Sequence, residues 1–185
     1  KTIYQYDTDG NLISSTDPEG HQIIYTYDAM GRVLSYTDGN DNTTNYEYDG
    51  NGNMTSSTDP FGEEEVYVYD SMNQVISHTD KRGKETVTEY DAMGRVLSTT
   101  DPLGRTISYT YDANGNVLTT TDAEGNTSYC EYDAENKLTK ITTAEGYETI
   151  FNYDIAGRLI STENALGNEV CVEYDADGNI THETT

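Results

Sequence analysis

The sequence has few of the residues on which compact globular proteins depend. In 185 residues it contains no tryptophan, two phenylalanines, two cysteines and three prolines, and 10 Lys and Arg stand against 34 Asp and Glu. Leu, Ile, Val and Phe together number only 30. Such a low apolar content, with a formal charge of −24, is typical of disordered chains. The shortage of basic residues argues against binding to nucleic acid or to anionic membranes, which requires basic patches.

Other absences exclude further classes of protein. No hydrophobic run is long enough to span a bilayer, and no stretch has the pattern of a signal peptide. Cys130 and Cys171 stand at different places relative to the nearest Tyr-Asp pair, so we expect them on opposite sheet faces without a disulfide between them. The three histidines occupy three different positions of the repeat, and none has a serine or cysteine partner at a constant spacing. We therefore expect no catalytic site, no metal-dependent chemistry and no cofactor.

What the sequence does contain is a strict repeat. A Tyr-Asp pair recurs every 21 residues, without insertion or deletion, over the whole chain. The nine pairs are Tyr6-Asp7, Tyr27-Asp28, Tyr48-Asp49, Tyr69-Asp70, Tyr90-Asp91, Tyr111-Asp112, Tyr132-Asp133, Tyr153-Asp154 and Tyr174-Asp175. A fixed period of this length indicates a repeat architecture rather than disorder.

Each Tyr-Asp pair opens a predicted tight turn. Three residues after the aspartate stands a residue that tolerates positive φ, either asparagine at 73 and 136 or glycine. The glycines are Gly10, Gly31, Gly52, Gly94, Gly115, Gly157 and Gly178. The pattern predicts a type I turn closed by a glycine bulge, which would pair each tyrosine with the apolar residue six positions later.

A second turn follows in each repeat. Asp101-Pro102-Leu103-Gly104 has the signature of a type I turn, and all three prolines occupy its second position. Each repeat is therefore expected to be two short strands and two turns. Of the 17 tyrosines, 14 occupy two positions on one face of a strand, so tyrosine supplies the missing apolar surface.

These observations predict an all-β fold. We expect nine 21-residue β-hairpin repeats in one long, twisted or spiralling antiparallel sheet, with neighbours sharing a continuous core. Residues 1–185 form a single array with no linker. Because the array begins and ends in mid-repeat, we expect it to be a segment of a longer protein.

Three turns resemble the start of a calcium-binding loop. Their candidate ligands are Asp49, Asn51 and Asn53, then Asp112, Asn114 and Asn116, then Asp175, Asp177 and Asn179. The acidic residue that completes such a loop is absent, since Pro60 and Ala123 occupy the twelfth positions of the first two. We expect a hairpin turn at each place, with weak calcium binding as the alternative.

The repeat resembles a known family. The pattern Tyr-Asp-x-x-Gly-Arg-Val/Leu-Leu/Ile-Ser-x-Thr-Asp-x-x-Gly, clearest over residues 90–104, is similar to the YD repeat of the Rhs family. This family includes bacterial Rhs and wall-associated polymorphic toxins, cocoon-forming subunits of insecticidal toxin complexes, and the animal teneurins. The resemblance implies a sheet that spirals into a hollow shell, which in bacterial members encloses a C-terminal toxin.

The resemblance sets two functional hypotheses. The first is a structural wall segment of a secreted or surface protein, with neighbouring repeats and an enclosed C-terminal effector as partners. The second is an adhesion or carbohydrate-binding module that uses exposed tyrosine stripes, for which Tyr36, Tyr129 and Tyr147 are off-pattern candidates. The chain has neither a toxin domain nor the motif that precedes toxin release. Nine repeats are fewer than a closed shell uses, so exposed end strands would favour edge-to-edge association between copies.

Overall fold

The computed structural model describes residues 1–184, and these contain eighteen β-strands and no helix. No segment of this part of the chain is therefore a helix that could span a membrane. The strands are β1 (Ile3–Tyr6), β2 (Leu12–Thr16), β3 (Gln22–Tyr27), β4 (Val33–Thr37), β5 (Thr43–Tyr48), β6 (Met54–Thr58), β7 (Glu64–Tyr69), β8 (Val75–Thr79), β9 (Glu85–Tyr90), β10 (Val96–Thr100), β11 (Thr106–Tyr111), β12 (Val117–Thr121), β13 (Thr127–Tyr132), β14 (Leu138–Thr142), β15 (Glu148–Tyr153), β16 (Leu159–Glu163), β17 (Glu169–Tyr174) and β18 (Ile180–Thr184).

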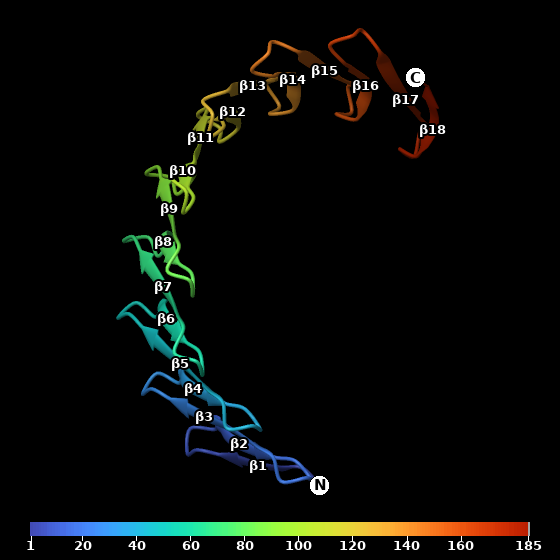
Figure 1. Cartoon of the computed structure of the whole chain (residues 1–185). Coiled ribbons are helices and arrows are strands. Elements are labelled where there is room, and N and C mark those ends of the chain that lie inside the picture. The colour runs from blue at the N-terminus through green and yellow to red at the C-terminus, as the bar shows by residue number, and fades with distance from the viewer. Residues whose placement is uncertain (185) are drawn as a thin grey trace. The chain divides into compact units, whose positions relative to one another are not determined.

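The chain divides into two compact units, Lys1–Gly94 and Arg95–Thr185. Within each unit every strand pairs with the next one in antiparallel fashion, β1 to β9 in the first and β10 to β18 in the second (Figure 1). Turns therefore lie in two rows. We call the turns that begin at the aspartates of the Tyr-Asp pairs the YD row, and the turns at the opposite strand ends the second row. The predicted all-β hairpin repeat is confirmed.

The predicted register is confirmed for the eight hairpins that lie within one unit. Tyr27, for example, pairs with Val33 and Tyr132 pairs with Leu138, in each case six residues later. The structure adds a β-bulge that the sequence did not predict. Thr26 pairs with Ser35 rather than with Leu34, so one residue of each even strand in these hairpins is left without a partner.

Both rows use the same turn. In the YD row, the Gly31 amide donates to the Asp28 carbonyl at 3.1 Å, and the Asp28 amide donates to the Arg32 carbonyl at 2.9 Å. The glycines predicted to take positive φ all do so, from 79° at Gly31 to 95° at Gly115. The three substitutes for glycine, Asp41, Asn73 and Asn136, adopt φ values of 62–64°. Asp at the head and Gly at the left-handed position thus specify most of the turns, as predicted, while Thr143 and Asn164 head two turns of the second row.

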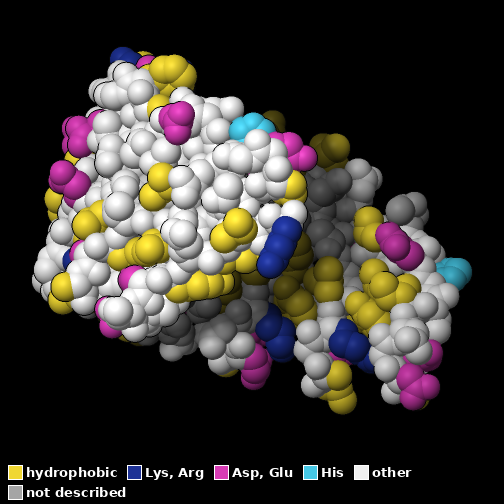
Figure 2. Space-filling model, turned by 90° about the horizontal axis from the view of Figure 1, so that it is seen from below, with side chains coloured by type: hydrophobic (Ala, Val, Ile, Leu, Met, Phe, Trp, Pro, Cys, Tyr) yellow, Lys and Arg dark blue, Asp and Glu magenta, His cyan; other side chains and the backbone are white. Residues whose placement is uncertain are grey.

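The sheet has no enclosed core. No hydrophobic side chain among residues 1–184 is fully buried; the buried polar residues are the four serines Ser14, Ser56, Ser57 and Ser161. The expected continuous core is instead a half-covered face, because a single layer gives each side chain neighbours beside it but none above it. On this tyrosine face the rings of Tyr25 and Tyr36 lie 5.3 Å apart. Figure 2 shows hydrophobic side chains gathered into bands on the visible surface.

The opposite face, here called the polar face, is rich in Thr and Ser hydroxyls but also carries the aliphatic side chains of Ile24, Val68 and Val87. Hydroxyl groups from neighbouring strands bond to one another there, as in Thr26–Ser35 at 2.6 Å and Thr121–Thr127 at 2.9 Å. Lys140 lies between Glu131 and Glu148, at 2.6 Å and 3.4 Å from their carboxylates. Hydrogen bonds and ion pairs thus connect strands on the polar face, whereas the ring contacts Tyr25–Tyr36 and Tyr67–His78 lie on the tyrosine face.

Candidate functional site: the tyrosine ladder and the turn rows

The tyrosines of the Tyr-Asp pairs form a hydrogen-bonded ladder. Each is the last residue of an odd-numbered strand. In the eight that follow Tyr6, the hydroxyl donates to the carbonyl of the residue fifteen positions earlier. The pairs are Tyr27–Leu12, Tyr48–Val33, Tyr69–Met54, Tyr90–Val75, Tyr111–Val96, Tyr132–Val117, Tyr153–Leu138 and Tyr174–Leu159, at 2.7–3.1 Å. The acceptor is the first residue of the preceding strand, so each of these tyrosines bonds to one repeat while belonging to the next.

This hydroxyl role was missed in the sequence. The signal was present, because all nine positions hold tyrosine and none holds phenylalanine. Partial burial, followed by the charges of neighbouring groups, raises the pKa of Tyr27 and of Tyr132. The phenol therefore stays protonated and acts as a donor at neutral pH.

The aspartates at the heads of the turns are acceptors within the turn. Oδ1 of Asp49 accepts from the amides of Asn51 and Asn53, each at 2.9 Å, and Oδ2 accepts from the side-chain amide of Asn53 at 2.9 Å. The bond from the Asn53 side chain is the largest cause that holds the pKa of Asp49 below its ordinary value.

The same pKa shift recurs in both rows. The pKa is lowered at Asp7, Asp17, Asp28, Asp38, Asp49, Asp59, Asp80, Asp101, Asp112, Asp122, Asp133, Asp154 and Asp175. The largest cause at Asp59 is the Lys81 ammonium, and elsewhere it is a hydrogen bond from the residue four positions later. Many of the acidic side chains of the protein thus accept hydrogen bonds within turns.

The calcium candidates all lie in these turns. Asp112 and Asp175 repeat the bonding of Asp49, with Asn116 and Asn179 as the side-chain donors. Each amide side chain points an N–H, rather than an oxygen, at the carboxylate that would bind the ion. Residues 1–184 contain no group of three or more His, Cys, Asp or Glu side chains placed to hold a metal. Calcium binding here stays a prediction, and turn hydrogen bonds already occupy the carboxylates.

Arginines connect neighbouring turns of the YD row. Arg32 donates from Nε to Asp28 Oδ2 at 2.6 Å and from Nη1 to the Asp49 carbonyl at 3.0 Å. Its guanidinium carbon lies 4.8 Å from the centre of the Tyr48 ring. Arg95 and Arg158 make the same contacts with the next turn, with guanidinium-to-ring distances of 4.6 Å.

The arginine contacts reveal a longer period. Arg32, Arg95 and Arg158 are 63 residues apart, which is three repeats. The asparagines that replace glycine, Asn73 and Asn136, are also 63 residues apart, and their side chains accept from Asn53 at 2.7 Å and Asn116 at 2.8 Å. Asparagine at these places therefore bonds to the preceding turn, a role that its tolerance of positive φ alone does not explain.

Replacing Arg32 with alanine should lower the free energy of unfolding of residues 1–94 by about 1–2 kcal/mol, because it removes a cation–π contact and a charge-assisted bond between turns. Arg82→Ala is the matched control in the same unit, since its side chain is 85% exposed and its ion pair with Asp80 is long, at 3.5 Å. We expect this control to change stability by less than about 0.5 kcal/mol. Urea unfolding of both variants measures the difference, and equal losses would contradict a specific role for Arg32.

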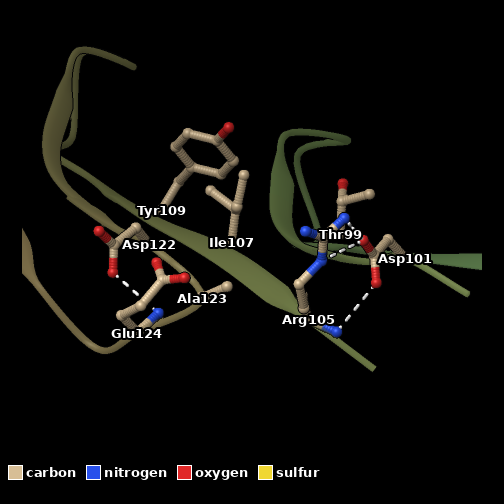
Figure 3. Close-up of a pocket in the computed structure, with 8 residues that line it drawn as sticks. All are labelled: Thr99, Asp101, Arg105, Ile107, Tyr109, Asp122, Ala123 and Glu124. Atoms are coloured by element: carbon tan, nitrogen blue, oxygen red, sulfur yellow. Dashed lines mark hydrogen bonds and ion pairs between the residues drawn. The ribbon is translucent and has the colours of Figure 1, made fainter. Parts of the chain in front are cut away.

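Adjacent turns leave open hollows between them. One, of about 510 Å³, lies between the second-row turns that begin at Asp101 and Asp122 (Figure 3). Ile107 and Tyr109 of β11 form its floor, and Arg105 on its rim is held by Asp101 at 2.7 Å. Its lining residues include no nucleophile paired with a base, so the hollow has no catalytic constellation.

Comparisons with known proteins agree with this geometry. The RHS repeat family matches residues 6–43, 31–64, 48–86, 69–106, 90–127 and 132–169, and no curated protein matches. Similar folds occur in crystal structures of TcdB2-TccC3, intact or without its hypervariable C-terminal region, at 19% identity and TM-scores of 0.55 and 0.56. A Tc holotoxin pore of Photorhabdus luminescens gives a TM-score of 0.51 at the same identity. The alignments cover 97% of this chain and 12% of each of those chains. The chain belongs to the RHS repeat family.

Proposed function

We propose that this chain is a wall segment of a shell that encloses or presents a C-terminal toxin or effector in a secreted or surface protein. The chain itself is a structural Rhs repeat segment. The observation that carries the proposal is the tyrosine ladder, in which the tyrosine that recurs in the repeats hydrogen-bonds to the preceding repeat.

A single-layer sheet suits a wall. Each repeat adds two strands and so extends the sheet by about 9.6 Å. The wall grows in this way as a single layer, with no second layer needed. The tyrosine face is rich in aromatic rings and the polar face in hydroxyl groups, so the two sides differ in chemistry. One of the structurally similar proteins is described as lacking a hypervariable C-terminal region, which supports a repeat shell associated with a variable C-terminal part.

The alternative, an adhesion or carbohydrate-binding module, receives less support. The ladder tyrosines that it would use are half-buried, with their hydroxyls bonded to backbone carbonyls. Tyr36 packs against Tyr25, whereas Tyr129 and Tyr147 are 53% and 60% exposed. The other exposed tyrosines among residues 1–184 are Tyr4 and Tyr6, at 57% and 59%, and both lie on the end strand β1. The exposed tyrosines are thus at separate places and form no stripe along the sheet.

The proposal is tested on the full-length protein that carries this segment. Electron microscopy is expected to show a hollow shell, and its C-terminal region should resist protease until the shell is unfolded. A solid or extended particle, or a C-terminal region digested as fast as the same region expressed alone, would overturn the proposal.

The end strands of this chain lead to a separate prediction. β1 and β18 are exposed along their whole length, and the outer side of each presents unpaired backbone groups. We expect the isolated 185-residue chain to form dimers or larger species as its concentration rises, measured by light scattering. Backbone groups alternate sides along a strand, and the Asp7 amide bonds toward β2, so the Tyr4 amide faces the open edge. Tyr4→Pro, which removes that outward donor, should weaken this association, and a mass independent of concentration would contradict edge pairing.

A further inference from the structure

We call the space between two successive turns of the YD row a notch. The first notch differs from the others. It lies between the turns that begin at Asp7 and Asp28 and forms a hollow of about 650 Å³. Asp7, Asp9 and Asn11 lie on one side, Asp28 and Met30 on the other, and the ring of Tyr27 lines it. The hollow thus combines an aromatic ring with three carboxylates.

Equivalent notches show what this geometry binds. In three of them the chain supplies its own guanidinium, because Arg32, Arg95 and Arg158 lie over the tyrosine of the next repeat and donate to the carbonyl of the aspartate that follows it. A fourth holds the Lys137 ammonium, 5.6 Å from the centre of the Tyr153 ring. The notch is therefore a cation site that the chain usually fills itself.

The remaining notches are bridged by amide side chains. Asn53 bonds to Asn73, Asn116 bonds to Asn136, and Gln74 donates to the Gly94 carbonyl at 2.9 Å. In the first notch the corresponding residue is Asn11, whose side-chain amide donates to Asp7 of its own turn at 2.9 Å. The Asn11 amide oxygen approaches Gly31 of the facing turn, but among residues 1–184 no side-chain hydrogen bond joins these two turns and no cation of the chain lies over Tyr27.

We propose that the notch over Tyr27 binds the guanidinium group of an arginine on a partner protein. The Asp28 carbonyl stands where the Asp49 carbonyl accepts from Arg32, and it carries the same single bond from the glycine of its turn, Gly31 in place of Gly52. Asp7, Asp9 and the overall charge of −24 complement a basic segment.

Guanidinium is favoured over ammonium by the shape of the site. The three internal occupants with the shortest ring distances are arginines, at 4.6–4.8 Å, whereas the lysine lies farther away. A planar guanidinium can stack on the ring and donate to a carbonyl at the same time, which an ammonium at the same distance cannot do as well.

The test uses N-acetyl-argininamide as the probe, titrated into the isotopically labelled chain and followed by NMR. We expect the shifts to concentrate at the amides of residues 7–11 and 28–31, and the lysine analogue to bind at least about twofold more weakly. Asn11→Arg places a guanidinium in the notch from within, so it should abolish these shifts and raise the unfolding temperature.

Asn40→Arg is the matched control, because it makes the same substitution at an exposed second-row turn of the same unit. It should leave the binding at the first notch intact. Shifts spread evenly over the acidic turns, equal affinity for the lysine analogue, or equal loss of binding in both variants would overturn the proposal. The first two results come from the unmodified chain, so they decide the matter even if Asn11→Arg does not fold.

Discussion

Replacing Tyr132 with alanine is expected to lower the free energy of unfolding of the second unit by about 2–4 kcal/mol. The change removes a half-buried aromatic ring from the tyrosine face and leaves the Val117 carbonyl without the hydroxyl that donates to it at 3.0 Å. Tyr132→Phe separates the two contributions, because it keeps the ring and removes only the hydrogen bond. We expect it to cost about 1 kcal/mol.

Tyr129 provides a control on the same strand. It lies three residues earlier in β13, on the polar face, and is 53% exposed. Tyr129→Ala should cost less than about 1 kcal/mol, since little burial is lost and β propensity changes only modestly. Urea unfolding followed by circular dichroism compares the variants. If Tyr129→Ala is as damaging as Tyr132→Ala, strand propensity rather than the ladder explains the repeated tyrosine.

The sequence predicted the turns and the register because both depend on close neighbours. In most turns the aspartate at the head accepts bonds from the amides of the residues two and four positions later, as Asp28 does from Met30 and Arg32. Gly or Asn at the left-handed position then fixes the pairing of the two strands. Interactions of this range can be read from a single 21-residue repeat.

Features that connect repeats were harder to predict. The acceptor for each ladder hydroxyl is a backbone carbonyl fifteen residues away, and carbonyls have no sequence signature. The extra bulge recurs at residues as different as Ile13, Leu34 and Thr55, so no residue type marks it in the sequence. The absence of a core follows from a missing second layer, which no local pattern encodes.

The candidate site, too, was only partly predictable from the sequence. The 63-residue spacing of Arg32, Arg95 and Arg158 is visible in the sequence, but the stronger 21-residue period masks it. That Asn11 leaves its notch open could not be predicted, because Asn53 is the same residue at the equivalent position and crosses to Asn73. What differs is the residue on the facing turn, Gly31 instead of asparagine.

Acid should unfold the sheet through its turns. A carboxyl whose folded pKa lies below the unfolded value contributes stability that is present above the unfolded value and lost as the pH falls through the folded one. The thirteen aspartates with lowered pKa have an ordinary value of 3.8, so their combined contribution is lost below about pH 4. Above that range the opposite trend holds, because lowering the pH from 7 toward the isoelectric point of 4.1 reduces self-repulsion.

We therefore expect the unfolding temperature to be level or to rise slightly from pH 7 to about pH 5 and to fall steeply below about pH 4. Thermal unfolding over this pH series measures the effect. The chain already contains a turn head that cannot titrate, since Oδ1 of Asn164 accepts from the amides of Leu166 and Asn168 at 2.9 and 3.0 Å. An amide can thus preserve the turn without the charge.

Asp80→Asn places an asparagine, as at Asn164, at the head of a turn that now begins with a titratable aspartate. Oδ1 of Asp80 accepts from the amides of Arg82 and Lys84 at 2.8 and 2.9 Å, and an asparagine oxygen can accept both. The variant should keep most of its stability at pH 7 and lose less than the unmodified chain on going to pH 3. Glu19→Gln removes a carboxyl from the tip of a turn rather than from its head, so it should leave the acid loss unchanged. An equal effect of both variants would mean that net charge, rather than the carboxylates that accept the turn hydrogen bonds, sets the acid limit of the fold.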